Sequence, residues 1–173
     1  MRFYKIFTAL LFSSAILSGC FNTPEYPNTP QIEFFDINSN PKLDQLSGVY
    51  FDEVVISIKY KDGDGYLGYE QWELDSLEKS DSNTGYNYLI KQFRKSQGKF
   101  IEYEGRENNN GYFQRISPEK PGPIEGKISR TIDIIHSFYR YRNDTIRFEI
   151  QIRDRAGNLS NTVTTDSVVV NWL

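Results

Sequence analysis

The chain contains 173 residues, of which 25% are charged, 38% are hydrophobic and 15% are aromatic, and its formal net charge is −3. This mildly acidic balance argues against a nucleic-acid partner, since proteins that bind nucleic acids carry basic patches for the phosphates. The single cysteine excludes an intramolecular disulfide, so stability must come from packing, or from packing together with a bound ion. The 12 Tyr and 12 Phe, with frequent Ile, Val and Thr, favour β strands.

Residues 1–19 have the layout of an export signal. Arg2 and Lys5 form a basic start, and an apolar run extends from Ile6 to Leu17. This run is shorter than the ~20 residues of a membrane-spanning helix, and small residues precede a cleavage point after it. Cleavage after residue 19 would remove two basic residues and no acidic one, which changes the formal charge from −3 to −5.

The apolar run ends in Leu-Ser-Gly-Cys, residues Leu17–Cys20. This tetrapeptide resembles the lipobox of bacterial lipoproteins, although a plain secretory signal is the alternative. The resemblance implies that Cys20 carries a diacylglyceryl group, becomes the new N-terminus and attaches the protein to a membrane. Phe21 stands where many inner-membrane lipoproteins have aspartate, which implies the outer membrane, on its periplasmic face or at the cell surface. Residues 20–30 contain three prolines and are predicted to form an extended linker.

Residues 31–173 show the alternation of polar and apolar side chains that is typical of β strands. The two clearest strands are 54–60 and 146–152. Further strands are predicted at 31–37, 69–74, 88–93, 99–103, 112–116, 128–135 and 163–172, with a break at Asn38–Pro41 and a loop at 75–87. Trp72 and Trp172 are expected in the core, and no substantial helix is predicted. Short strands separated by frequent turns indicate an all-β, antiparallel sandwich.

The two clearest strands each end in a polar loop, Lys61–Gly68 and Asp154–Asn161. Together these loops resemble those of uncharacterised Bacteroidetes-type lipoproteins with an immunoglobulin-like β-sandwich domain. The resemblance implies one immunoglobulin-like domain over residues 31–173, in which 54–60 and 146–152 are the B and F strands. Residues 75–126 would then be an insertion, or extra strands, between the early and late strands.

The same two loops contain the candidate metal ligands Asp62, Asp64, Asp154 and Asn158. If their strands are B and F of opposite sheets, both loops lie at one end of the sandwich and could share a Ca²⁺, which prefers oxygen ligands. The twelve-residue spacing of the EF-hand is not matched. Because Asp, Asn and Gly also build tight turns, a purely turn-forming role is the alternative.

The candidate binding residue Tyr66 lies in the first of these loops and the second, Tyr69, directly follows it; aromatic rings of this kind can stack on sugars. His136, the only histidine, is predicted to be structural, so an enzyme is not expected. The leading interpretation is a non-enzymatic, lipid-anchored binding or scaffolding module of the cell envelope, with an envelope protein or a glycan as partner. A carbohydrate-binding accessory lipoprotein and an envelope hydrolase are the alternatives.

Overall fold

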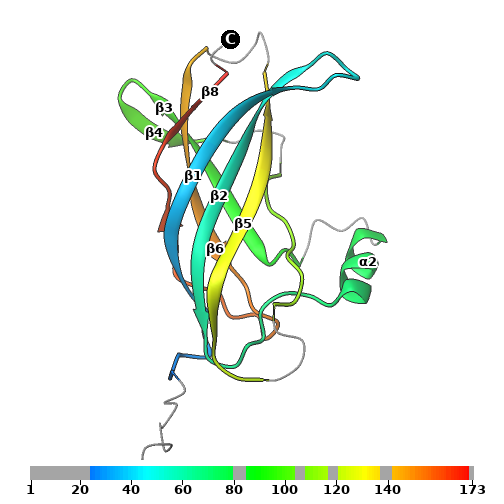
Figure 1. The fold of residues 1–173 in the computed structure, drawn as a ribbon. Helices are drawn as coiled ribbons and strands as arrows, with labels where there is room; N and C mark the ends of the chain where they lie inside the picture. The colour runs from blue at the N-terminus through cyan, green and yellow to red at the C-terminus, as the bar shows by residue number, and fades with distance from the viewer. Residues whose placement is uncertain (1–23, 80–84, 104–107, 117–120, 137–141, 172–173) are drawn as a thin grey trace, which may run out of the picture.

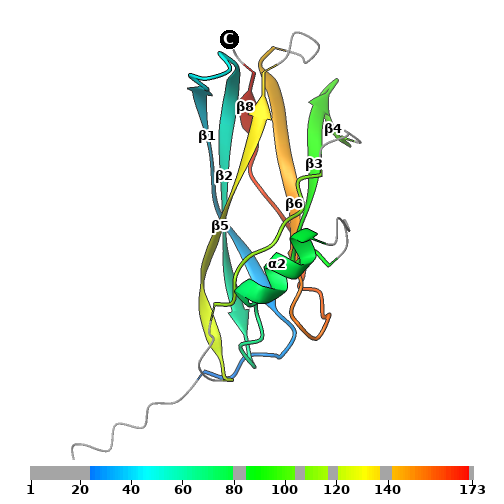
Figure 2. The same ribbon diagram turned by 90° about the vertical axis from the view of Figure 1, so that its right-hand side faces the viewer.

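The computed structural model describes residues 24–79, 85–103, 108–116, 121–136 and 142–171, which form two facing antiparallel β-sheets (Figures 1 and 2). The first sheet has the order β1-β2-β5, and the second has the order β4-β3-β6-β7, with β8 also paired to β6. The bounds are β1 Gln31–Leu43, β2 Tyr50–Asp62, β3 Tyr88–Ser96, β4 Lys99–Glu102, β5 Ile124–Ile135, β6 Asp144–Ile152, β7 Val163–Thr164 and β8 Val168–Val170. The predicted all-β sandwich is therefore confirmed.

The core is built on β2 and β6, one from each sheet. Because successive side chains of a strand point to opposite faces, one row of each strand faces the interior. These two rows are fully or almost fully buried, as the alternation predicted: Val54, Ile56, Ile58 and Tyr60 on β2, and Ile146, Phe148, Ile150 and Ile152 on β6. Each such side chain contributes about 1.5–3 kcal/mol by its removal from water.

The predicted break at Asn38–Pro41 is wrong, because β1 continues through it to Leu43 and pairs Pro41 with Asp52. Proline cannot donate a hydrogen bond, but β1 is an edge strand, where that loss is tolerated. The register shifts at a bulge between Phe34 and Asp36, which explains the loose alternation of residues 31–37.

The predicted strand at 69–74 and the first part of the predicted loop at 75–87 are also wrong, because a short helix, α2, spans Gln71–Lys79. Residues 85–87 form a loop as predicted, and residues 80–84 lie outside the described part of the chain. The Glu73 carboxylate accepts a hydrogen bond from the Glu70 N–H at 2.7 Å, which is one half of a capping box at the start of the helix. The helix lies beside the sandwich (Figures 1 and 2), and Trp72 on it is 70% exposed rather than in the core. Trp172, the signal segment and Cys20 lie outside the described residues.

The remaining elements agree with the predictions in part. The β3–β4 hairpin turns at Gln97 and Gly98, as expected, and β5 is a strand. Residues 112–116 form no strand; Gln114 makes an isolated bridge to Tyr69, and the preceding residue Gly111 makes one to Tyr88. The predicted final strand is divided into β7 and β8.

The sandwich has two distinct ends. Residues 24–30 join it at the proximal end, which also carries the loops 62–68 and 154–161 (Figures 1 and 2). There the Gly63 N–H donates a hydrogen bond to the Pro27 carbonyl at 2.8 Å, which continues the β1–β2 pairing. The β1–β2 hairpin (residues 43–50) and the C-terminal segment lie at the distal end. No helix in the described part of the chain has the length and apolarity to cross a membrane.

Candidate functional site

Both loops that carry the candidate metal ligands lie at the proximal end. The Arg155 N–H donates a hydrogen bond to the Tyr66 carbonyl at 3.1 Å, which joins the two loops directly. The carboxyl group of Asp62 lies close enough to Asp64 and Asp154 for both to raise its pKa. The structure therefore gathers three carboxyl groups from two strands of opposite sheets.

The two central strands share a feature that the sequence analysis did not use. On each strand the inward row begins and ends with a buried aspartate: Asp52 and Asp62 on β2, and Asp144 and, just past its end, Asp154 on β6. Each pair is separated by five two-residue steps along an otherwise apolar row, so the period-two alternation alone could have predicted their burial. A buried carboxylate needs hydrogen-bond or ionic partners, which makes the partners of each aspartate informative.

Three of these four aspartates have partners within the protein. At the distal end, one Asp52 oxygen accepts hydrogen bonds from His136 Nε2 and from the Asn171 N–H. Asp144 forms an ion pair with the Arg94 guanidinium, with Nε and Oδ2 2.5 Å apart. Asp154 Oδ1 and Oδ2 accept hydrogen bonds from the N–H and the side-chain amide of Asn158, each at 2.7 Å.

Asp62 is the exception among the four. Its side chain is completely buried, and neither carboxylate oxygen accepts a hydrogen bond of normal geometry. The pKa of this carboxyl is raised to about 7, chiefly by burial and then by the charge and side-chain hydrogen bond of Asp64 and the charge of Asp154, while the nearby Gly65 N–H lowers it in part. An unpaired buried carboxylate is costly, so Asp62 at neutral pH needs a proton or a cation.

The other candidate ligands are partly used by their own turns. Asp64 Oδ1 accepts the Tyr66 N–H at 3.1 Å, and Asn158 holds Asp154, as described above. Within the described residues, no three side chains of His, Cys, Asp or Glu are arranged to hold a metal ion by themselves. The turn-forming alternative thus accounts for Asn158, and it leaves the unpartnered oxygens of Asp62 unexplained.

The two candidate binding tyrosines differ in their surroundings. Tyr66 is 38% exposed. Tyr69 packs edge-on against Tyr112, with ring centroids 6.1 Å apart, and its hydroxyl donates a hydrogen bond to the Gly85 carbonyl. Tyr69 is therefore a packed side chain rather than an open platform. The exposed aromatic that the sequence analysis misplaced is Trp72, whose neighbour Glu73 joins α2 to the second loop through Arg155.

His136 connects three parts of the distal end. It follows β5, its ring is paired with Asp52 of β2, and Asp52 in turn accepts the N–H of Asn171. Its side chain is only 9% exposed, and its ring stacks on Tyr50. This position favours a structural role, because a general base must reach its substrate.

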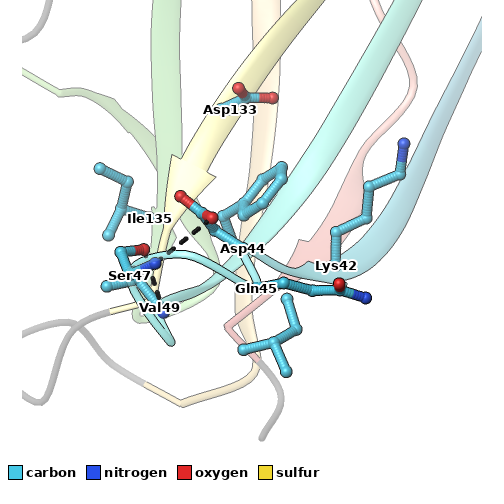
Figure 3. Close-up of a pocket in the computed structure, with 9 residues that line it drawn as sticks. Lys42, Asp44, Gln45, Ser47, Val49, Asp133 and Ile135 are labelled. Atoms are coloured by element: carbon cyan, nitrogen blue, oxygen red, sulfur yellow. Dashed lines mark hydrogen bonds between the residues drawn. The ribbon is translucent and has the colours of Figure 1, made fainter.

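A pocket of about 580 Å³ lies at the distal end, where the β1–β2 hairpin bends beside the last residues of β5 (Figure 3). The hairpin loop is held by Asp44, whose Oδ1 accepts the N–H groups of Leu46 and Ser47 at 2.9 and 3.4 Å. These hydrogen bonds lower the pKa of Asp44, so this carboxylate is charged at neutral pH. The pocket is lined by Lys42, Leu43, Asp44, Gln45, Ser47, Val49, Phe51, Asp133 and Ile135.

The distal pocket is a site that the sequence analysis missed. Leu46, at the tip of the hairpin, is 100% exposed although its backbone is fixed by Asp44. An isolated exposed leucine is ordinary, but here Leu43, Val49 and Ile135 are exposed beside it. The sequence offered one indication of this pocket, which is the apolar Leu46 inside an otherwise polar turn. It gave no indication that Asp133 and Ile135 of β5 would line the same pocket.

The raised pKa of Asp62 predicts an unusual dependence of stability on pH in metal-free solution. The folded protein holds this proton up to about pH 7, whereas an unfolded chain releases it near pH ~3.9. The contribution of this group to stability should therefore be complete below about pH 4, fall as the pH rises to about 7, and be lost above it. Asp62→Asn should remove this decline and be more stable than the wild type by up to ~4 kcal/mol at pH 8.

Urea unfolding of both proteins between pH 4 and 8 in the presence of a chelator measures this effect. Asp36→Asn, a substitution of an exposed aspartate on β1, is the matched control and should keep the wild-type profile. Parallel profiles for wild type and Asp62→Asn would contradict the prediction.

The molecule thus presents two candidate sites, a group of carboxyl groups at the proximal end and an apolar pocket with two carboxylates at the distal end. The first site offers carboxylate oxygens, which are suited to binding a cation. The second combines exposed apolar side chains with charged groups, as protein interfaces do. Comparison of the chain with protein-family models, curated proteins and solved structures found no match in any of the three.

Proposed function

We propose that the chain is a non-enzymatic, lipid-anchored binding module of the bacterial envelope, built on an immunoglobulin-like sandwich. The strand order supports the immunoglobulin-like assignment. With β1, β2 and β5 as A, B and E, and β4, β3, β6 and β7 as C′, C, F and G, the two sheets have the A-B-E and C′-C-F-G orders of that fold. In this assignment β2 and β6 are the B and F strands.

The lipobox-like Leu17–Cys20 supports the lipid anchor. The place where the linker joins the sandwich supports an orientation of the sandwich relative to the membrane. Residues 24–30 meet the proximal end, so acyl chains on Cys20 would hold that end towards the membrane. A linker of about ten residues could span up to ~30 Å, at ~3.1 Å per residue. The loops 62–68 and 154–161 would then face the lipid, and the distal end would face away from it.

The distal end is accordingly the surface that contacts a partner. The main support for this is Leu46, which is fully exposed on a hairpin loop whose shape is fixed by hydrogen bonds to Asp44. Rigid exposed apolar side chains beside a pocket are typical of protein interfaces. Two carboxylates, Asp44 and Asp133, line the pocket, and its Lys42 is paired with Glu53 at 2.7 Å. The partner that fits is an envelope protein that presents an apolar side chain beside Lys or Arg.

Site-specific photo-cross-linking in the native host tests this surface. A photoreactive amino acid in place of Leu46 should give one discrete protein adduct, and the same amino acid in place of Ser76, exposed on α2, should give none. Adding Asp133→Lys to the Leu46 probe should reduce the adduct at least tenfold, because a cation would replace the attracting charge. Adding Asp36→Lys, an equal change of charge on an exposed part of β1, should leave it unchanged.

The absence of an adduct at position 46, or an adduct whose yield is unchanged by Asp133→Lys, would contradict the proposal that the distal end is the contact surface.

A glycan-binding role is the second candidate function, and the 70% exposure of Trp72 favours it. A change in Trp fluorescence on addition of envelope polysaccharide, together with a silent Leu46 probe, would put that role in place of the first.

A further inference from the structure

We propose that Asp62 and Asp64 bind Ca²⁺ at the proximal end of the sandwich, with Asp154 as a third, neighbouring negative charge. The inference is independent of the proposed contact surface at the distal end. It concerns a site built from two loops that are 90 residues apart in the chain and joined by the Arg155–Tyr66 hydrogen bond.

The aspartates at the two ends of the inward row of β2 differ in their partners. Asp52 and Asp62 are both 0% exposed and belong to the same strand. Asp52 faces an imidazole and a main-chain N–H, which both donate to it. The oxygens of Asp62 have no hydrogen-bond partner of normal geometry, and the groups that act on this carboxyl are the Gly65 N–H and the carboxyl groups of Asp64 and Asp154. Among the described residues, Asp62 therefore lacks the close partner that Asp52, Asp144 and Asp154 each have.

The guanidinium of Arg155, on the second loop, is already paired with Glu73. Arg155 is on the same loop as Asp154, but its two terminal nitrogens donate to the two Glu73 oxygens at 2.6 and 2.8 Å. This bidentate pair fixes the start of α2 to the loop, so both terminal nitrogens of Arg155 are used by Glu73. A cation from solution could therefore supply the positive charge at Asp62 that Arg155 does not.

The chemistry of the group favours Ca²⁺ over other cations. The residues concerned offer carboxylate oxygens, whereas Zn²⁺ prefers imidazole and thiolate. Ca²⁺ accepts six to eight oxygens at ~2.3–2.6 Å in flexible geometry and completes its shell with carbonyls and water. Two carboxylates are thus sufficient, and a convergence of three acidic side chains is not required. Asp64 is only half-buried, so its side chain remains in contact with solvent.

The expected consequence is a stiffer proximal end, because the ion would tie the buried end of β2 to the turn at Asp64 that follows it. With two or three carboxylates, the affinity should fall in the range of extracellular calcium modules, a Kd of ~10⁻⁴–10⁻³ M. At about 10 mM Ca²⁺ the melting midpoint of the protein should rise by roughly 3–10 °C over that in chelator.

Thermal unfolding and calorimetric titration of the full chain, purified in detergent, test the site. The wild type and Asp36→Asn should both show the rise with Ca²⁺ and a smaller one with Mg²⁺, whereas Asp62→Asn and Asp64→Asn should show less than a third of it. Asp62→Asn removes charge without changing shape, so its circular dichroism spectrum and its midpoint in chelator should match or exceed those of the wild type. Loss of its response would therefore not reflect unfolding.

Three results would overturn the inference. Coincident wild-type curves in Ca²⁺ and chelator would mean that Asp62 holds only a proton or water. Equal responses to Ca²⁺ and Mg²⁺ would indicate general screening of charge. An unchanged Ca²⁺ response in Asp62→Asn would move the site elsewhere. Because none of these measurements involves the distal hairpin, they leave the photo-cross-linking result to decide the contact surface by itself.

Discussion

Replacement of Cys20 by Ser should move the protein from the membrane fraction to the soluble fraction almost completely. Each buried acyl CH₂ contributes ~0.8 kcal/mol to membrane binding, and one chain alone binds only marginally and reversibly. A diacylated Cys20 would carry at least two chains, so removal of the thiol that bears them eliminates the whole anchor.

Fractionation of cells, followed by a carbonate wash and metabolic labelling with an alkyne fatty acid, measures this effect. Asn22→Ser, a mild change two residues away, should remain labelled and attached. If Cys20→Ser stays in the washed membranes, or if the wild type takes up no label, the protein is not anchored in this way and the proposed orientation of the sandwich fails with it.

Gly68→Ala should destabilise the fold by ~3 kcal/mol or more. Gly68 has a φ of +86°. A Cβ at this position would lie 2.2 Å from the Gln114 carbonyl oxygen and 2.5 Å from its carbon. These are backbone atoms of the segment that crosses beside the loop, where the Tyr69 N–H donates to the Phe113 carbonyl and Tyr69 accepts the Arg115 N–H. The alanine would therefore separate the two segments.

Gly98→Ala is the matched control for this prediction. Gly98, in the β3–β4 turn, has a similar φ of +81°, but nothing lies within 4 Å of a Cβ added there. Its replacement should cost only the backbone preference, ~1 kcal/mol. Urea unfolding of the two variants separates the contribution of the close approach from that of the conformation. Equal losses of stability would show that the contact between Gly68 and Gln114 is unimportant.

The local alternation of side chains predicted the central strands correctly, because every second side chain of a strand points to the same face of the sheet. For β2 and β6 the inward rows required no knowledge of the partner strands. The same reasoning failed at Pro41, since whether a proline breaks a strand depends on whether that strand is at an edge. It failed at α2 because a nine-residue helix has a weak periodic signal, and its Glu70–Glu73 cap was overlooked.

The residue types of each loop and the inward rows of the two central strands follow from the sequence alone, and so does the contact of Asp154 with Asn158, because it is local to one turn. The partners of Asp52 depend on the fold, because His136 and Asn171 reach it from distant parts of the chain. The fold likewise leaves the oxygens of Asp62 without a hydrogen-bond partner of normal geometry. The direction of the strands places residues 24–30 and both aspartate loops at one end and Leu46 at the other, since strand direction is a property of the whole sheet.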